Sequence, residues 1–220
     1  MVVAIDGPAA SGKSSTAHWV ASELGFCHVD SGAIYRAVTA AALRRRLPQD
    51  EWSSRLVLEA AGIVTVDSSG PVVHLLLDGQ PAEGELRSPP VTAAVPRVAR
   101  MAPIRAWVNE QLRRVAATRD VVADGRDIGS AVFPEADVKV FLVADPWERA
   151  RRRLVQHLRR APTDDEIAAE TDRLVHRDAA DATQSVQARD AVQIDTTHLM
   201  QEEQVARIVA LVRAAVRSRT

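Results

Sequence analysis

The chain has 220 residues, 46% of them hydrophobic, and its 28 Lys and Arg nearly balance its 29 Asp and Glu, giving a formal net charge of −1. This balance excludes a broad basic interface for nucleic acid, and the single cysteine excludes an intrachain disulfide or a cysteine-cluster metal site. No apolar run approaches the roughly 20 residues of a membrane span, and the N-terminus lacks a signal-peptide pattern. We therefore expect one domain, 1–220, in a cytoplasmic monomer that binds neither membrane nor nucleic acid.

The first predicted elements are a short buried strand over 2–5, a glycine-rich loop, and a helix that ends at Gly25. The loop reads GPAASGKS and fits G-x-x-x-x-G-K-[ST], the pattern of a phosphate-binding loop. In this arrangement backbone N–H groups and the positive helix end face one phosphate cluster. Lys13 would reach the β- and γ-phosphates of a nucleotide, and the Ser14 hydroxyl would bind Mg²⁺. The residues predicted to bind ATP are Gly7, Pro8, Ala9, Ala10, Ser11, Gly12, Lys13, Ser14 and Ser15.

A glycine turn with a solvated lysine is the alternative interpretation of this loop. The chain has only two lysines, Lys13 and Lys139, and nearly all its other positive charge is arginine. A lysine inside the loop is therefore unexpected as a surface residue, and we favour the phosphate site.

The next part of the chain is predicted to contain a strand at 27–29, helices over 33–47 and 51–61, and a β-hairpin formed by 63–66 and 72–77. We interpret residues from about 62 to 90 as a small β-rich insertion. Helices are then predicted over 92–100 and 104–117, separated at Pro103.

The core pattern returns with strands at 121–123 and 138–143 and a basic helix from Pro146 toward Arg160. Thr163 and Glu166 form a capping-box pattern that starts a charged helix to about Asp178. A strand at 192–195 and a helix over 205–216 complete the chain. Strands that alternate with helices predict an α/β fold whose central parallel sheet is covered by helices on both faces, with ligands at the carboxyl ends of the strands.

A phosphate-binding loop alone does not separate an ATPase, a GTPase and a small-molecule kinase. GTPases usually carry an N-K-x-D element, and neither lysine lies in one; 220 residues leave little for a mechanical ATPase. Arginines follow several predicted strands, and a kinase with a phosphorylated acceptor must bind two anionic substrates at once. The residues therefore favour a small-molecule kinase.

Several motifs resemble those of the bacterial cytidylate kinases, which are nucleoside monophosphate kinases. They are DSGAIYR at 30–36, LDG at 77–79, GELR at 84–87, ADGRD at 123–127, ERA-x-RR at 148–153 and RD-x-x-D at 177–181. The similarity is colinear from residue 2 to the C-terminal helix. It implies the P-loop kinase three-layer fold, with an acceptor-binding insertion at 62–102 and a helical lid at 148–178. It also implies ATP- and Mg²⁺-dependent phosphorylation of CMP or dCMP.

The resemblance assigns an acceptor-binding role to Ser31, Arg36, Arg105, Arg126, Asp127, Arg177 and Asp181. Arg36 and Arg126 would bind the acceptor phosphate, and Asp127 would accept a hydrogen bond from the cytosine 4-amino group, as acidic side chains do in nucleic-acid recognition. Asp181 would bind sugar hydroxyls, and Arg177 would bridge sugar and phosphate.

The implied catalytic residues are Lys13, Arg126, Arg152 and Arg153. In the lid helix, Arg149 would join Arg152 and Arg153 in neutralising charge at transfer; Arg152 and Arg153 lie in an arginine-rich helix and can equally face solvent. Asp30 and Asp124 remain open as helix caps or as Mg²⁺ ligands through water.

Three features depart from the family pattern, all on the acceptor side. One is the absence of the A-P-L segment that normally follows the RD-x-x-D-x-x-R pattern, which leaves 185–189 shorter than expected; the other two are single residues. Pro96 occupies the place of a serine that helps to recognise cytosine, and Gln184 replaces the arginine that normally ends the RD-x-x-D-x-x-R pattern. Three hypotheses remain open: a CMP/dCMP kinase, a diverged kinase for a modified pyrimidine nucleotide or related small phosphate, and a nucleotide-binding regulatory protein without turnover.

Overall fold

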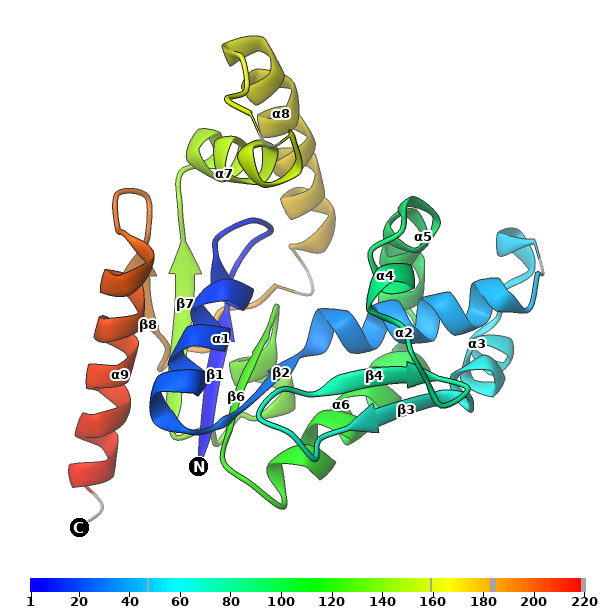
Figure 1. Cartoon of the computed structure of the whole chain (residues 1–220), viewed down its shortest axis with the longest axis horizontal. Helices are drawn as coiled ribbons and strands as arrows, with labels where there is room; N and C mark the ends of the chain where they lie inside the picture. Colours follow the sequence, from blue (N-terminus) through cyan, green and yellow to red (C-terminus); the bar gives the residue numbers. More distant parts are fainter. Residues whose placement is uncertain (47, 159, 183–184, 219–220) are drawn as a thin grey trace. The chain divides into compact units, whose positions relative to one another are not determined.

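The computed structural model describes residues 1–46, 48–158, 160–182 and 185–218. The chain divides into two compact units, the first made of Met1–Gly25 and Val122–Thr220, the second of Phe26–Val121 (Figure 1). The single domain 1–220, with its insertion and lid, stays a prediction. No helix among the described residues is long and apolar enough to cross a bilayer.

The first unit is built on the parallel sheet that the sequence predicts. Its strands are β1 (Val2–Asp6), β6 (Val121–Gly125), β7 (Val138–Val143) and β8 (Val192–Asp195), in the order β6-β1-β7-β8. β1 pairs with β7 in parallel at Val3↔Val138, and β7 pairs with β8 at Val140↔Val192. The end of β1 thus lies between two strands that follow it in the chain. This is the switch point at which open α/β sheets bind ligands.

Helices α1 (Lys13–Leu24) and α9 (Gln201–Arg217) pack against each other, and α9 also contacts β7. Thr16 Oγ1 donates to Gln204 Oε1 at 2.8 Å, and both side chains are buried. A π-helix, η2 (Ile128–Val132), packs on β1 and was not predicted. The start of α1 is therefore fixed directly after β1, as a phosphate-binding loop requires.

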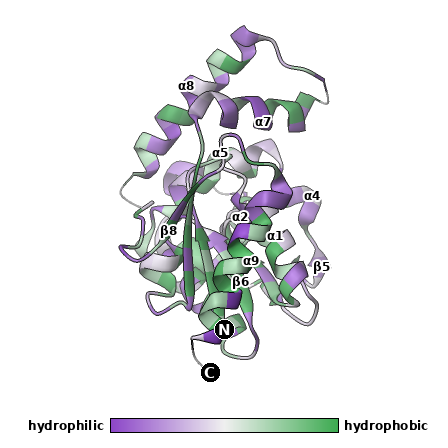
Figure 2. Ribbon diagram, turned by 90° about the vertical axis from the view of Figure 1, so that its left-hand side faces the viewer, coloured by the Kyte–Doolittle hydropathy of each residue, from purple (hydrophilic) through white to green (hydrophobic). Residues whose placement is uncertain are grey.

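Helices α7 (Pro146–Leu158) and α8 (Asp164–Asp181) form a pair with many hydrophilic residues (Figure 2). The predicted capping box is present, since Thr163 and Glu166 exchange hydrogen bonds with each other's backbone N–H. α8 runs three residues further than expected, to Asp181. Arg177, Asp178 and Asp181 consequently lie on one helix within little more than one turn.

The second unit contains β2 (Cys27–Asp30) and is organised around α2 (Ser31–Arg44), which contacts α3 (Ser54–Ala61), α4 (Glu83–Leu86), α5 (Pro89–Ala99) and α6 (Ala102–Ala116). Asp30 is the N-cap of α2 and accepts a hydrogen bond from the Ala33 N–H at 3.1 Å. Asp30 therefore caps this helix, which is one of the two roles that the sequence left open. The predicted end of this helix, Leu47, lies outside the described residues.

The predicted hairpin is confirmed as β3 (Val64–Asp67) and β4 (His74–Leu77), paired antiparallel at Val64↔Leu77, with β5 (Gln80–Pro81) added to β4. Two boundaries were wrong. The helix expected from residue 51 is a 3₁₀ turn, η1 (Gln49–Glu51), and then α3, because the Ser53 side chain accepts the Leu56 N–H and starts a new helix. Pro89 and Pro90 begin α5 rather than ending the insertion, since the first helical positions need no N–H donor.

Asp6, the last residue of β1, is a buried carboxylate that accepts the Ile128 and Gly129 N–H groups, each at 2.8 Å. Burial is the largest influence and raises its pKa from 3.8 to about 6; the two N–H groups and Lys13 oppose the rise, and Asp127 adds to it. Between these pH values the folded chain holds a proton that the unfolded chain has released. Folding stability due to this group is therefore greatest at low pH and is lost as the pH rises through about 6.

We expect the free energy of unfolding to fall by about 2 kcal/mol from pH 4 to pH 7 through this residue. The loss runs from the unfolded pKa of 3.8 to the folded pKa of about 6 at about 1.36 kcal/mol per unit, and it has already begun at pH 4. Urea unfolding of the wild type and Asp6→Asn at several pH values measures the difference. Asparagine does not titrate, so the variant should lack this part of the pH dependence. Equal slopes in the two proteins between pH 4 and 6 would contradict the assignment.

Candidate active site

The phosphate-binding loop joins β1 to α1. Gly7 lies so close to β7 that a Cβ atom would overlap the Leu142 carbonyl oxygen, which explains the glycine. Gly12 caps α1 with φ 88°, and Ala10 adopts φ 58°, a left-handed conformation that costs a non-glycine residue about 1 kcal/mol. Alternating right- and left-handed residues turn successive N–H groups to one side and form an anion-binding concavity.

Lys13 and Ser14 open α1 at the base of this concavity. The Lys13 ammonium donates to the Pro8 carbonyl at 3.1 Å, so its stem lies along the loop. Ser14 Oγ donates to Asp124 Oδ2 at 2.5 Å, and Asp124 is buried at the end of β6. Asp124 therefore contacts the predicted Mg²⁺ residue rather than capping a helix.

A hydroxyl and a carboxylate are oxygen ligands of the kind that Mg²⁺ prefers, and this ion commonly takes its other ligands from water and phosphates. Ser14 and Asp124 thus fit the ion. The structure shows no cluster of three or more His, Cys, Asp or Glu suited to a metal within the described ranges. The Ser11 hydroxyl, which lies within the phosphate-binding loop, is buried and has no hydrogen-bond partner among the described residues.

Three of the predicted acceptor residues meet beside the loop. Arg126 follows β6 directly and donates to the Gly7 carbonyl at 2.9 Å and to Asp181 at 3.2 Å, and Arg177 Nε lies 3.7 Å from the same carboxylate. Burial lowers the pKa of Arg126, with Asp181 opposing the shift, but a guanidinium remains protonated. Asp127, next in the chain, is the N-cap residue of η2, with its carbonyl bonded to the Ala131 N–H at 2.8 Å.

The other predicted acceptor residues lie in the second unit. Ser31 is buried at the first position of α2, Arg105 is half-buried in the first turn of α6, and Arg36 is half-buried on α2. Arg36 Nη1 donates to the Leu86 carbonyl at 3.2 Å and to Thr92 Oγ1 at 3.0 Å. These contacts hold its guanidinium against α4 and α5.

Thr92 is a polar residue at this site that the sequence did not reveal. It lies on α5 one turn before Pro96, on the same helix face, and Pro96 has no N–H to donate to the Thr92 carbonyl. The position therefore offers a hydroxyl and a carbonyl beside Arg36. The spacing of four residues from the proline is the only sequence signal for it. Gln184, the second departure from the family pattern, lies outside the described residues.

The two lid arginines predicted as catalytic are both engaged within their own unit. Arg152 donates to the Thr196 and Thr197 carbonyls at 2.7 and 3.0 Å and to Glu148 at 3.0 Å. Arg153 forms an ion pair with Glu170 at 2.9 Å. Neither points freely into solvent, and their catalytic role stays a prediction.

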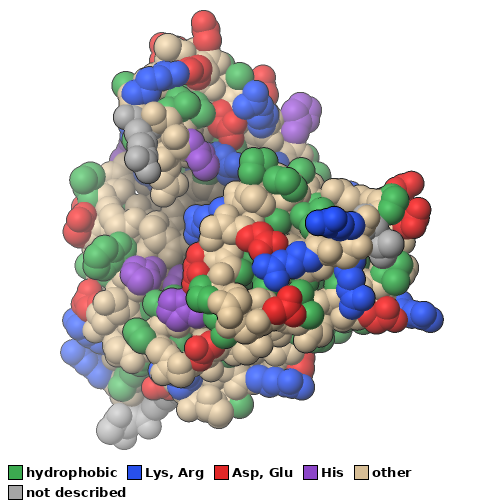
Figure 3. Space-filling model, turned by 45° about the vertical axis from the view of Figure 1, so that its right-hand side comes forward, with side chains coloured by type: hydrophobic (Ala, Val, Ile, Leu, Met, Phe, Trp, Pro, Cys, Tyr) green, Lys and Arg blue, Asp and Glu red, His purple; other side chains and the backbone are tan. Residues whose placement is uncertain are grey.

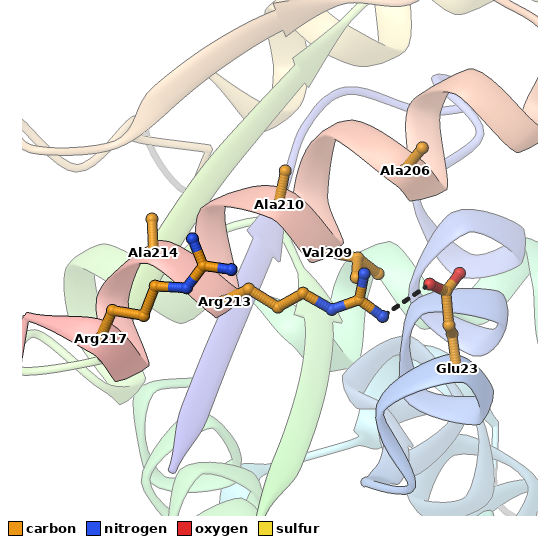
Figure 4. A pocket seen from close by; sticks show the side chains of 7 residues that line it. All are labelled: Glu23, Ala206, Val209, Ala210, Arg213, Ala214 and Arg217. Carbon is orange, nitrogen blue, oxygen red and sulfur yellow. Dashed lines mark hydrogen bonds and ion pairs between the residues drawn. The ribbon is translucent and has the colours of Figure 1, made fainter.

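A cavity of about 250 Å³ lies elsewhere, between α1 and α9, and is lined by Glu23, Ala206, Val209, Ala210, Arg213, Ala214 and Arg217 (Figure 4). Arg213 bridges it to Glu23 at 3.3 Å. No residue predicted to bind substrate lines it. Three alanines, one valine and three charged residues line it, and we assign it no part in the candidate site.

A phosphate-binding loop at the switch point of a parallel sheet, with arginines after the neighbouring strand, defines a P-loop phosphotransferase. The sequence model of the family described as cytidylate kinase matches residues 3–214. The chain belongs to the cytidylate kinase family.

Relatives named cytidylate kinase share more than a third of its residues over nearly the whole length. That of Pelotomaculum thermopropionicum is 39% identical over 221 residues, covering 98% of this chain and 97% of the relative. That of Chloroherpeton thalassium is 38% identical over 219 residues, covering 96% and 92%. A solved structure of an uncharacterised protein from Eubacterium ventriosum is similar with a TM-score of 0.54 and 9% identity, covering 97% and 98% of the two chains, which supports the fold alone.

Proposed function

We propose that the protein transfers the γ-phosphoryl group of ATP to the phosphate of CMP or dCMP, giving the nucleoside diphosphate and ADP. Family membership over residues 3–214 supports the reaction. The observation that carries the site is the contact of Arg126 with Gly7 at 2.9 Å. An arginine of the acceptor motif thus lies at the donor loop, and in-line transfer requires donor and acceptor phosphates to be held close together.

Each residue type suits its part of this transfer. The loop N–H groups and Lys13 hold the donor phosphates, and Arg126 and Arg36 bind acceptor phosphate oxygens as bidentate donors. Bound Mg²⁺ would supply charge neutralisation at the transferring phosphates, with Ser14 and Asp124 as its protein ligands. Arg152 and Arg153 would leave Thr196, Thr197 and Glu170 to stabilise the charge that develops during transfer.

Asp127 would select the base, since its carboxylate accepts from the cytosine amino group and opposes the uracil carbonyl. Pro96 removes the family's base-reading hydroxyl, whereas Thr92 places another one turn earlier beside Arg36. This relocation favours a second candidate, a kinase for a modified pyrimidine nucleotide or a related small phosphate.

We infer a cytoplasmic monomer that works on small nucleotides and not on nucleic acid. The near-neutral net charge, and the basic and acidic side chains intermixed over the face in Figure 3, support the last of these points, the absence of a nucleic-acid interface.

The test is ADP release from ATP and Mg²⁺ with CMP, dCMP, UMP, AMP and 5-substituted cytidylates as acceptors. The highest kcat/KM for CMP or dCMP is expected. Turnover restricted to a substituted cytidylate would favour the second candidate, and the absence of any acceptor-dependent turnover would overturn both.

A further inference from the structure

One ion pair on the α7–α8 pair engages both backbone polar groups of a single residue in the phosphate-binding loop. Arg149 Nη1 donates to the Ala9 carbonyl at 2.9 Å and to Asp178 Oδ2 at 2.6 Å. The Ala9 N–H in turn donates to Asp178 Oδ1 at 3.4 Å. The pair therefore fixes the orientation of the Ala9 peptide groups on both sides.

This contact is buried. Arg149 is only 4% exposed and Ala9 5%. Ala9 also packs into an apolar cluster with Ala150, Ile167 and Leu174, joined by the partly buried Ala10 and Leu154. Ala9 is thus held against α7 and α8 both by apolar packing and by hydrogen bonds to charged side chains. Hydrogen bonds to charged groups contribute more than neutral ones, and more where water is excluded.

Ala9 is followed by Ala10, whose backbone is strained. Ala10 has φ 58°, a left-handed conformation that glycine adopts more easily than alanine, so neighbouring contacts must maintain it. The hydrogen bond to Arg149 opposes rotation of the Ala9 carbonyl into the concavity of the loop. A loop carbonyl rotated into that concavity would repel a phosphate.

A second arginine–aspartate pair is arranged in the same way. Arg126 donates to the Gly7 carbonyl and to Asp181, as Arg149 does to the Ala9 carbonyl and Asp178. The two carboxylates lie three residues apart on α8, on one face of the helix. Two carbonyls of the loop, those of Gly7 and Ala9, are therefore connected through an arginine to the helix that carries predicted acceptor residues.

We propose that Arg149 and Asp178 are positioning residues that hold the phosphate-binding loop in its anion-binding conformation. They act through Ala9 and touch no substrate. The inference rests on the proposed function for the identity of the donor, ATP. It gives Arg149 a different role from the charge neutralisation that the lid motif implies, and it gives Asp178 a role that the motifs do not assign.

The experiment measures MgATP affinity of the full chain by isothermal titration calorimetry, and KM for ATP and CMP by ADP release. Asp178→Asn should weaken ATP binding and raise KM for ATP about 10-fold, the factor that corresponds to one lost charged hydrogen bond. KM for CMP should change less than threefold. Asp178→Glu, which restores the carboxylate, should recover at least half of the loss on a logarithmic scale.

Asp172→Asn is the matched control, the same change on the exposed face of α8, and should bind ATP like the wild type. Arg149→Met, which removes the charge and both donated hydrogen bonds, should resemble Asp178→Asn; thermal unfolding verifies that each variant is folded. Unchanged ATP affinity in folded Asp178→Asn and Arg149→Met overturns the proposal, and so do equal rises in both KM values. A wild type that binds ATP without acceptor turnover overturns the proposed function but leaves the calorimetric result decisive for this pair.

Discussion

Replacing Lys13 by methionine is expected to lower kcat by about 10³-fold, the upper range for removing one preorganised donor from a developing charge. Methionine keeps an unbranched stem of similar length but has no charge and no N–H. Lys13 begins α1 and lies against the Pro8 carbonyl at 3.1 Å, so its ammonium is held within the loop before substrate arrives. The charge it neutralises grows as the phosphoryl group leaves ATP, so the loss should appear mainly in kcat.

ADP release at saturating ATP and CMP measures the effect, and calorimetry with MgATP separates it from donor affinity. We expect the affinity to fall by about tenfold only, because the loop N–H groups and helix end still bind the phosphates. Arg213→Met is the control, a change from cation to methionine in the same unit at an exposed ion pair with Glu23. More than a tenth of wild-type kcat in Lys13→Met would contradict the assignment of Lys13 as catalytic.

The sequence predicted the parts of this fold whose signals are local. The strand–loop–helix unit at the N-terminus, the hairpin and the Thr163 capping box each depend on neighbouring residues, and each was found where expected. The errors occurred where local signals conflict. Pro89 and Pro90 were interpreted as an end although proline equally begins helices, and α8 has no glycine or proline to mark its end, so its length was underestimated.

In the candidate site, too, the sequence predicted what local motifs determine and did not predict contacts between distant segments. Lys13, Ser14 and Arg126 could be assigned because a short motif fixes the backbone around each of them. The motifs implied charge neutralisation for Arg149 and no role for Asp178, and neither motif predicted their contact with Ala9, because it joins segments 140 and 169 residues away from Ala9 along the chain. Thr92 had only its spacing from Pro96 as a signal, because its hydroxyl contacts Arg36, which another helix supplies. Periodicity describes one element at a time and does not report such pairings.

Replacing Arg126 by lysine should cost about 10²- to 10³-fold in kcat/KM for the acceptor although the charge is kept. The Arg126 guanidinium already serves the Gly7 carbonyl and Asp181 through two different nitrogens, and its planar fork leaves further N–H groups for a phosphate. A lysine ammonium has three donors at one point and cannot serve three separated acceptors in the same geometry. Steady-state kinetics with CMP varied at saturating ATP measures the loss, with exposed Arg114→Lys on α6 as control.

A double variant tests whether Asp181 acts through Arg126. If Asp181 only orients the Arg126 guanidinium, then removing its carboxylate should cause little further loss of activity once Arg126 has been replaced by lysine. Asp181→Asn alone should lower kcat/KM for the acceptor about 10-fold, and the double variant should be no more than about threefold worse than Arg126→Lys, because residues in direct contact are not additive. Losses that multiply would mean that Asp181 binds the acceptor independently of Arg126. In that case the carboxylate would be a ligand of the sugar hydroxyls, as its motif implies, and the ion pair observed beside Gly7 would have no part in orienting the arginine.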